Sequence, residues 1–321
     1  MLAARAVRAL PDDPLAALEV ADAPADPAPE GWVRVDVRAA ALNRHDLWSL
    51  RGVGLPAERL PMVLGCDAAG TTEDGEEVVV HAVVTPDDVR GDETLAPSRT
   101  LLSELHPGTL AEHVHVPRRN LLPLPAGWSP ERGASLGTAW LTAYRMLFTQ
   151  AAAVPGQTVL VQGAAGGVSN ALVVLGAAAG LRVWVAGRDP ERSQRALDWG
   201  ADRVFAAGER LPEKVDAAFE TVGEATWKHS VASLRPGGCV VVSGATTGGA
   251  PPAMLEHVFF KQLRVLGSTM GTLEEFRRLL RFCELRDLAP QVDSVHALAD
   301  ARDAFARLES GRAVGKVLVR P

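Results

Sequence analysis

Hydrophobic and polar residues alternate along the first part of the chain with the period of β-strands. Trp32–Arg38 and Leu110–Val116 have the period of two that half-buried strands show, and Glu77–Val83 predicts a further strand. Thr85–Pro107 is polar, contains proline and has no strong period, so we predict a long loop there. The N-terminal region is therefore predicted to be rich in β-structure.

After Pro130 the pattern changes to alternating strands and helices. Glu131–Gln150 predicts one long helix with an apolar stripe. The strands predicted after it are Thr158–Gln162, Arg182–Ala186, Arg203–Phe205, Val215–Phe219, Cys239–Ser243 and Leu263–Gly267. The helices predicted between most of them are Gly167–Ala179, Pro190–Trp199, Glu224–Leu234 and Pro252–Lys261. Such alternation with continuous apolar strands predicts a parallel sheet covered on both faces. The tail predicts helices at Thr272–Glu284 and Asp300–Glu309 and a last strand at Lys316–Val319.

Length and composition narrow the class of protein. A chain of 321 residues favours two domains. The net charge of -6 argues against a nucleic-acid partner, which usually requires a basic face. No apolar run is long enough for a membrane span, and no secretory signal follows Met1. Three distant cysteines provide neither a disulfide framework nor a Cys-x-x-Cys zinc site, so we expect a cytoplasmic protein.

A glycine-rich turn follows the first strand of the predicted parallel sheet. The strand Thr158–Gln162 leads into Gly163-Ala-Ala-Gly166-Gly167-Val168-Ser169, and a helix of small residues comes next. Such a turn lets backbone N–H groups and the helix N-terminus bind a pyrophosphate. Against the pattern G-x-G-x-x-G only Gly166 matches, and a plain tight turn is the alternative. The β-α-β context favours dinucleotide binding.

The end of the next strand indicates which dinucleotide is bound. NAD enzymes usually place an acidic residue there to bind the ribose 2′-hydroxyl. This chain has Gly187 at that position, with Arg188 and Arg192 just beyond it. Arginines suit a 2′-phosphate and predict NADPH. Two alternatives stay open: the arginines are solvated residues at the start of a helix, or Asp189 serves as the acid in a shifted register.

Several motifs in the correct order resemble the medium-chain dehydrogenase/reductase superfamily over nearly the whole chain. They include Ala41-Leu-Asn-Arg-His-Asp-Leu-Trp48, Leu64-Gly-Cys-Asp-Ala-Ala-Gly70, Gly108-Thr-Leu-Ala-Glu112, Leu136-Gly-Thr-Ala-Trp-Leu-Thr-Ala-Tyr144, Thr221-Val-Gly223, Leu234-Arg-Pro-Gly-Gly238, Gly267-Ser-Thr-Met-Gly271 and Gly315-Lys-Val317. The chain is most similar to the zinc-free quinone oxidoreductase-like branch, which is often described as zinc-binding alcohol dehydrogenase.

The resemblance implies an α/β fold with two domains. A GroES-like, β-rich catalytic domain would comprise residues 1–123 and 273–321, and an inserted Rossmann domain with a doubly wound parallel sheet would comprise residues 124–272. It also implies a homodimer or homotetramer. The implied cofactor-contacting residues are Arg44, Thr142, Gly163, Ala165, Gly166, Gly167, Val168, Gly187, Arg188, Arg192, Thr221, Val222, Gly244, Ala245, Ser268, Met270 and Lys316. For Lys316, a solvated lysine is the alternative.

The residues at the zinc-binding positions of the relatives differ in this chain. The alignment places Asn43, Cys66 and Thr138 where zinc-dependent relatives have Cys, His and Cys or Asp. Neutral amide and hydroxyl oxygens are poor zinc ligands, so we predict that no metal is bound. An improvised site of His45, Cys66 and Asp67 is the alternative.

Without a Lewis acid, the expected chemistry moves from alcohols to conjugated substrates. We predict an NADPH-dependent oxidoreductase that reduces a quinone or an α,β-unsaturated carbonyl by direct hydride transfer. The predicted catalytic residues are Asn43 and Thr138, which would hydrogen-bond substrate or cofactor, and His45, a general acid. Alternatively, His45 is a surface or packing residue. The rival functions are a zinc-dependent alcohol dehydrogenase and a non-catalytic NADPH-binding protein.

Overall fold

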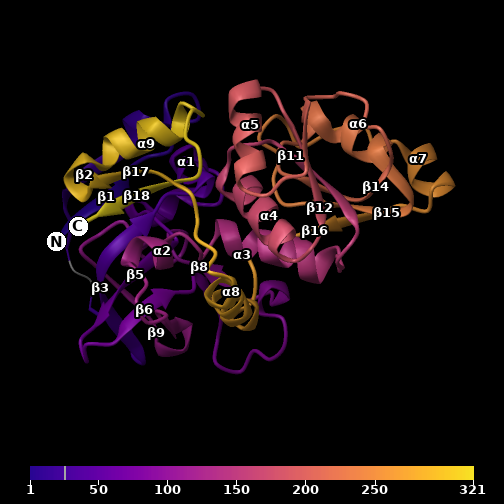
Figure 1. Ribbon diagram of the computed structural model, residues 1–321. Helices are drawn as coiled ribbons and strands as arrows, with labels where there is room; N and C mark the ends of the chain where they lie inside the picture. Colours follow the sequence, from indigo (N-terminus) through magenta and orange to yellow (C-terminus); the bar gives the residue numbers. More distant parts are fainter. Residues whose placement is uncertain (25–26) are drawn as a thin grey trace. The chain divides into compact units, whose positions relative to one another are not determined.

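The computed structural model describes residues 1–24 and 27–321, which form two compact units (Figure 1). Unit 1 comprises Met1–Ala139, Thr272–Glu284 and Ala289–Pro321, and unit 2 comprises Trp140–Gly271 and Leu285–Leu288. Both chain ends thus belong to one unit. Residues 124–139, which were predicted to be part of the Rossmann domain, pack with unit 1, because helix α2 (Pro130–Ala134) lies against strands β3 (Trp32–Ala41) and β5 (Asp67–Thr72).

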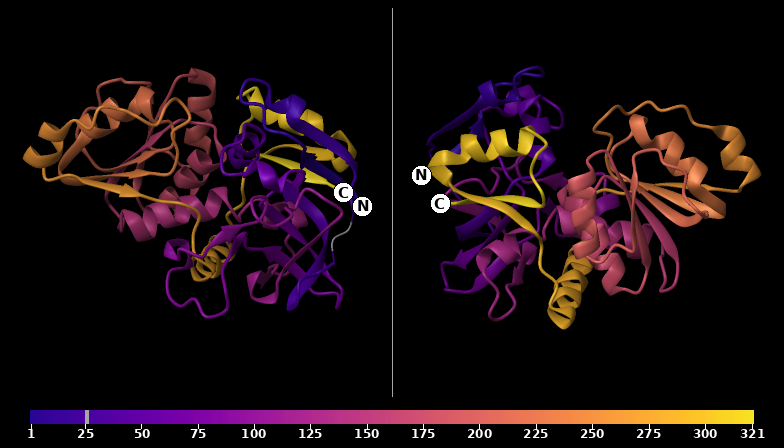
Figure 2. Two further views of the ribbon diagram at one scale, coloured as in Figure 1. Left: turned by 180° about the vertical axis from the view of Figure 1, so that it is seen from behind. Right: turned by 45° about the horizontal axis from the view of Figure 1, so that its top comes forward.

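Unit 1 is built around a mostly antiparallel sheet that the C-terminal strand joins. The strands of the unit are β1 (Leu2–Ala6), β2 (Leu18–Asp22), β3 (Trp32–Ala41), β4 (Met62–Val63), β5 (Asp67–Thr72), β6 (Glu77–Val80), β7 (Val83–Val84), β8 (Thr100–Leu101), β9 (His113–Pro117), β10 (Leu121–Pro123), β17 (Val292–Ala297) and β18 (Lys316–Arg320). The main sheet has the order β10-β6-β5-β3-β18-β17, with β17 and β18 paired in parallel, and β9 also pairs with β3. The yellow strand β18 therefore lies beside the indigo strand β3 (Figure 2), in antiparallel register with Leu318 opposite Ala41.

The helices of unit 1 are α1 (Arg44–Leu50), α2 (Pro130–Ala134), most of α8 (Leu273–Arg286) and α9 (Ala301–Glu309). Helix α2 packs against β3, β5 and β6 of the main sheet, and α9 packs against β17 and β18. Short 3-10 turns occur at Pro14–Ala17, Ala57–Arg59, Glu93–Leu95, Arg118–Asn120 and Leu298–Asp300. Helix α2 packs closely on the sheet because residue 133 is glycine: a Cβ there would lie 2.7 Å from Val79 and 2.5 Å from Leu124.

Unit 2 is a doubly wound parallel sheet, and this confirms the predicted fold class. Its strands are β11 (Thr158–Gln162), β12 (Arg182–Gly187), β13 (Arg203–Ala206), β14 (Val215–Glu220), β15 (Leu234–Val242) and β16 (Arg264–Gly267). All neighbours pair in parallel in the order β13-β12-β11-β14-β15-β16, which is the classic dinucleotide-binding order. The helices are α3 (Ala139–Tyr144), α4 (Gly167–Ala178), α5 (Pro190–Asp198), α6 (Glu224–Ser233) and α7 (Leu255–Phe260). Helices α4 and α5 lie on one face of the sheet and α6 on the other (Figures 1 and 2).

The predicted single helix over Glu131–Gln150 is wrong. Helix α2 ends at Ala134, helix α3 begins at Ala139, and Arg145–Gln150 is a π-helical segment. The interruption makes a tertiary contact, because a Cβ on Gly137 would lie 2.7 Å from a carboxylate oxygen of Asp67. A close approach of backbone to this buried acid therefore overrides the local helical pattern.

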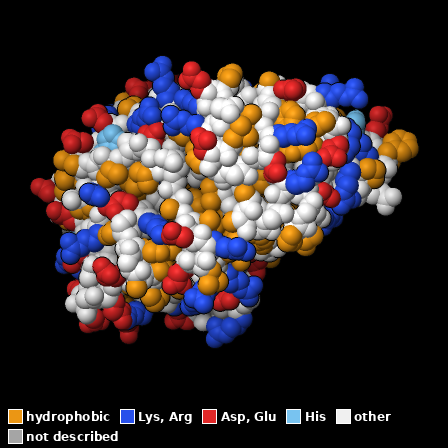
Figure 3. Space-filling view, in the orientation of Figure 1, with side chains coloured by type: hydrophobic (Ala, Val, Ile, Leu, Met, Phe, Trp, Pro, Cys, Tyr) orange, Lys and Arg blue, Asp and Glu red, His pale blue; other side chains and the backbone are white. Residues whose placement is uncertain are grey.

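Smaller differences concern the ends of elements. The predicted strand Glu77–Val83 is split into β6 and β7, Leu110–Val116 is shortened to β9, and the helix Pro252–Lys261 is shortened to α7. Within the described residues, no helix has both the length and the hydropathy that a membrane crossing needs. On the face seen in Figure 3, basic and acidic side chains are interspersed.

Candidate active site and dinucleotide site

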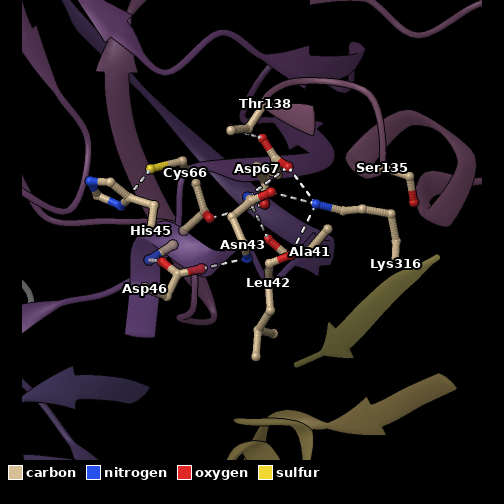
Figure 4. A network of polar contacts seen from close by, with 12 residues as sticks. Ala41, Leu42, Asn43, His45, Asp46, Cys66, Asp67, Ser135, Thr138 and Lys316 are labelled. Carbon is tan, nitrogen blue, oxygen red and sulfur yellow. Dashed lines mark hydrogen bonds and ion pairs between the residues drawn. The ribbon is translucent and has the colours of Figure 1, made fainter. Parts of the chain in front are cut away.

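A buried ion pair between Lys316 and Asp67 organises the predicted catalytic residues of unit 1 (Figure 4). The Lys316 ammonium, on the last strand, donates to Leu42 O at 2.9 Å, Asn43 Oδ1 at 2.6 Å and Asp67 Oδ2 at 3.2 Å. Asp67 begins β5 and also accepts from Asn43 Nδ2 at 2.9 Å and Thr138 Oγ1 at 2.6 Å. Lys316 is only 2% exposed and Asp67 is fully buried, so each charge depends on the partners within this network.

The same contacts occupy the polar groups that were predicted to meet a substrate. The Thr138 hydroxyl donates its hydrogen to Asp67, and the Asn43 amide donates to Asp67 while its oxygen accepts from Lys316. Thr138 can still accept a hydrogen bond through its oxygen. The alternative of a solvated Lys316 is wrong, because its side chain is 2% exposed.

Asp46 fixes the start of α1 beside this network. Its carboxylate accepts from the backbone N–H of Asn43 at 2.7 Å and of Gly65 at 3.0 Å. The side chain is fully buried, and that burial raises its pKa, although His45 and the Asn43 N–H act in the opposite direction. Asp46 thus holds two segments of the site in place, as the capping acid of a helix N-terminus.

His45 lies next to this network with both ring nitrogens in contact with other side chains. Nε2 is 2.8 Å from Glu104 Oε1, and Nδ1 is 3.7 Å from the Cys66 sulfur. Burial alone would lower the pKa of His45, but Cys66 and Glu104 raise it well above its ordinary value. The side chains of His45 and Glu104 each keep 24% exposure. His45 is thus a partly accessible imidazole whose protonated form is stabilised by its neighbours.

In unit 2 the predicted pyrophosphate turn leaves a helix N-terminus without a cap. Gly163 has φ +88°, a conformation that favours glycine, and the chain then enters α4 at Gly166. No side chain caps that end of α4 within the described residues. The first N–H groups of a helix need acceptors, so this turn offers backbone donors to an anion.

A side chain at the position that decides the nucleotide would displace a hydrogen-bonded hydroxyl. A Cβ on Gly187 would lie 2.3 Å from Ser193 Oγ, and that hydroxyl is held by a bond to Asp189 O at 2.8 Å. The Asp189 carboxylate caps α5 by accepting from Glu191 N and Arg192 N, and it pairs with Arg192 at 3.2 Å. Arg188 is exposed and forms no side-chain hydrogen bond or ion pair within the described part of the chain.

Most of the other predicted cofactor residues follow the carboxyl ends of the parallel strands, where dinucleotides bind in this fold. By strand, they are Ala165, Gly167 and Val168 after β11, Thr221 and Val222 after β14, Gly244 and Ala245 after β15, and Ser268 and Met270 after β16. The hydroxyl of Ser268 is buried and has no partner in the described structure. Thr142 is buried on α3, and Arg44 is exposed on α1 of unit 1.

Comparison with known proteins identifies the family. Residues 29–126 match the family model of the alcohol dehydrogenase GroES-like domain, and residues 167–284 match that of zinc-binding dehydrogenases. The probable acrylyl-CoA reductase of Escherichia coli is 31% identical over 74% of this chain and 74% of its own length. The chain is a member of the medium-chain dehydrogenase/reductase superfamily. This confirms the resemblance and the GroES-like assignment of unit 1, and it makes the chain an oxidoreductase of a family with a nucleotide-binding fold.

Other members of this superfamily cover almost the whole chain. The quinone oxidoreductase of Lama guanicoe is 27% identical over 90% of this chain and 89% of its own length. A crystal structure described as an NAD-dependent alcohol dehydrogenase superposes with a TM-score of 0.91 at 32% identity and covers 100% of both chains. Family membership alone therefore does not decide between NAD and NADP or between alcohol and alkene substrates.

The zinc that the family description implies does not fit the residues of this chain. Asn43 and Thr138 are neutral, and the Lys316 ammonium already occupies the oxygen of Asn43. The Cys66 sulfur lies within 3.5 Å of Leu102 O and Ser103 Oγ, next to His45. Within residues 1–24 and 27–321, no group of three or more His, Cys, Asp or Glu is arranged to hold a metal ion. A zinc ion needs anionic or imidazole ligands that converge, and these side chains do not provide them.

Two functional side chains of unit 1 were not selected from the sequence. Asp67 is part of a recognised motif, but only the structure shows that Lys316, Asn43 and Thr138 converge on it. Glu104 lies in the segment that we predicted as a loop, 59 residues from its partner His45. Its neighbour Ser103 has φ +67°, an uncommon conformation for a residue other than glycine. No local sequence signal pairs a loop acid with a histidine so far along the chain.

Proposed function

We propose that this oxidoreductase uses NADPH to reduce the activated C=C bond of an α,β-unsaturated carbonyl, or a quinone, without zinc. The observation that carries the proposal is the Lys316 ammonium bound to Asn43 and Asp67. The ammonium already bonds the Asn43 and Asp67 oxygens that a metal ion at this place would have to bind. Chemistry that does not need a Lewis acid is therefore favoured over alcohol oxidation.

The choice of NADPH is supported by the residues at the end of β12. An aspartate or glutamate at Gly187 would collide with Ser193, while Arg188 has a free guanidinium just beyond it. A guanidinium binds a phosphate through two parallel, charge-assisted hydrogen bonds. Bound NADPH would supply the hydride. The glycine turn of Gly163–Gly167 would hold the pyrophosphate through backbone N–H groups.

The chain's own contribution to the chemistry is proton delivery and orientation. His45 combines a raised pKa with partial exposure, so it is the candidate to deliver a proton to the reduced substrate. Asn43 and Thr138 are oriented by their hydrogen bonds to Asp67. In the reduction of an alkene, hydride adds to the carbon far from the carbonyl, and the proton completes the product at the adjacent carbon or at oxygen.

The substrate class is supported by the names of the relatives. The Escherichia coli relative is described as a probable acrylyl-CoA reductase and the Lama guanicoe relative as a quinone oxidoreductase. To test the proposal, purified protein is mixed with NADPH or NADH and a panel of enones, enoyl thioesters, quinones, aldehydes and alcohols, and nicotinamide absorbance is followed. We expect turnover with enones or quinones and NADPH. Turnover restricted to alcohols and aldehydes would contradict the proposal.

Two other functions are distinguished by simple measurements. A zinc-dependent alcohol dehydrogenase would contain stoichiometric zinc when purified without chelators, and its activity would be lost on dialysis against chelator. A non-catalytic NADPH-binding protein would bind NADPH tightly but show no turnover with any member of the panel.

We also propose that the protein forms a homodimer through strand β16, the outer strand of the unit 2 sheet. Val265 on this strand and Leu255, Phe259 and Phe260 on α7 are exposed, Phe260 by 79%. A second copy would cover these apolar side chains and pair the open strand edge. Light scattering after gel filtration should give a dimer for the wild type and a monomer for Val265→Asp combined with Phe260→Asp. A wild-type monomer at micromolar concentration would contradict this proposal.

A further inference from the structure

Unit 2 contains a buried carboxylate that the proposed chemistry does not use. Glu220 is the last residue of β14 and is fully buried. Its Oε1 accepts from the backbone N–H groups of Val222 at 2.8 Å and Gly223 at 3.0 Å. The hydroxyl of Thr226 lies 2.8 Å from Oε2, and that of Ser230 lies 2.7 Å from the same oxygen. Neutral donors therefore surround this acid, and none of these contacts comes from Lys or Arg.

The number of donors matches what an ionised carboxylate can accept. Two oxygens offer about four acceptor positions, and two N–H groups and two hydroxyls fill them. Burying a carboxylate costs much free energy unless such donors compensate it. Two of the donors are the backbone of the turn that joins β14 to α6. The Glu220 carboxylate thus binds the backbone of this turn and restrains its conformation.

Hydrogen-bond directions extend this network from β14 to β11. Because Glu220 can only accept, the Ser230 hydroxyl must donate to it and so must accept from Gln162 Nε2 at 3.0 Å. The second hydrogen of that amide faces His229 Nδ1 at 2.9 Å, and His229 Nε2 donates to Glu209 O at 2.8 Å. Gln162 is the last residue of β11 and directly precedes the glycine turn.

The two turns that this network joins also lie close to each other. A Cβ added to Gly163 would be 3.7 Å from Val222 Cγ2. On the other side, Val222 O accepts from Thr247 N at 2.8 Å, which fixes the segment after β15. Gly223 has φ +95°, and a Cβ there would lie 2.5 Å from Gly248 O, so the turn has little freedom of its own.

We infer that Glu220 is a positioning residue that fixes the Thr221–Gly223 turn and, through Ser230 and Gln162, locks it to the Gly163–Gly167 turn. This inference rests on the proposed function, in which both turns contact the dinucleotide. The two turns would thus be held in one rigid arrangement before the cofactor binds. Preorganisation of this kind increases affinity because less conformational freedom is lost on binding.

The test compares two isosteric changes at opposite ends of the same strand. Glu220→Gln keeps the size of the side chain but turns an NH2 group towards two of the four donors. Asp216→Asn is the control: Asp216 lies near the start of β14 and accepts from Thr158 N at 2.8 Å and Arg235 Nε at 2.7 Å, far from the carboxyl ends of the strands. We expect Glu220→Gln to raise the Kd for NADPH roughly tenfold and Asp216→Asn to leave it unchanged.

A measurement on the protein without cofactor separates this inference from the proposed function. Hydrogen exchange of the 221–226 and 163–169 segments should be faster in Glu220→Gln than in the wild type and unaltered in Asp216→Asn. Ser230→Ala keeps the other donors of Glu220. It should accelerate exchange at 163–169 and raise the Kd for NADPH about threefold. This variant is used in place of Glu220→Gln if Glu220→Gln does not fold. Unchanged exchange at both turns overturns the inference even if the wild type binds NADPH. If exchange is faster in Glu220→Gln than in the wild type but the wild type binds neither nucleotide, the locking of the turns stands and the proposed function is overturned.

Discussion

The predicted site residues of the two units differ in how far their polar groups are already satisfied. In unit 1, Lys316, Asn43 and Thr138 each donate to Asp67, and Lys316 also donates to Asn43. In unit 2, the N-terminus of α4 has no side-chain cap, Arg188 has no side-chain partner in the described structure, and the Ser268 hydroxyl is buried without one. The polar groups of this unit 1 network are thus partnered within the protein, whereas unit 2 has donors without a protein partner in the described structure.

This difference predicts what a substitution in each unit should change. Removing a group that is partnered and buried leaves its partner unpaired, and this destabilises the fold. Removing a donor that has no protein partner costs the fold little, but it removes an interaction available to a ligand. Unit 1 substitutions should therefore lower stability, and unit 2 substitutions should weaken cofactor binding.

The largest effect is expected for Lys316→Met. The change leaves the Asp67 carboxylate fully buried without its cation, which should lower the free energy of unfolding by about 3–5 kcal/mol. Urea denaturation followed by circular dichroism measures it. The double variant Lys316→Met/Asp67→Asn removes both charges and should recover most of the loss. If the double variant is no more stable than Lys316→Met, the charge of Asp67 is not what Lys316 compensates.

A smaller effect, on binding alone, is expected for Arg188→Ala. Loss of charge-assisted bonds to a 2′-phosphate should weaken NADPH binding by about 2 kcal/mol, or roughly 30-fold, and leave NADH binding unchanged. The midpoint of urea unfolding should not move. Arg195→Ala is the matched control, because Arg195 is another exposed arginine further along α5. Titration of nicotinamide fluorescence with both nucleotides gives the dissociation constants for the wild type and both variants. Equal losses for NADPH and NADH in Arg188→Ala would reject the 2′-phosphate contact.

The sequence predicted the parallel strands better than the polar network, and the reason is physical. Strands such as Thr158–Gln162 are continuous apolar runs whose identity depends on local pattern and burial. The helix over Glu131–Gln150 was wrong because Gly137 and Thr138 contact Asp67, which lies 71 residues from Thr138 in the chain. A contact of that separation leaves no local periodicity.

The candidate site shows the same limit. Motifs located Asn43, His45, Thr138 and Lys316, but the direction of each side chain depends on partners from other strands. Lys316 reaches Asn43 across 273 positions because β18 pairs with β3. Glu220 could have been noticed as an acid that ends the apolar run of β14, with Thr226 six residues on, yet only the fold shows that Gln162 completes the network.

The smallest effect should appear in the pH dependence of stability when Glu104 is changed to glutamine. The pKa of His45 is raised in the folded protein, so the pair with Glu104 stabilises fully below the ordinary histidine value near 6.5 and is lost as pH rises through the folded value. The pair is partly exposed, so we expect about 1 kcal/mol or less.

The measurement is the difference in unfolding free energy between wild type and Glu104→Gln at about pH 6 and about pH 9. It should be larger at the lower pH, because only protonated His45 gains from the carboxylate. Taking a difference cancels the titration of His106 and His113, whose pKa values are lowered chiefly by burial. In a His45→Gln background the pH dependence of the difference should disappear. A difference that is equal at both pH values would show that the effect of Glu104 on stability does not depend on the charge of His45. The raised pKa of His45 would then have a cause other than Glu104.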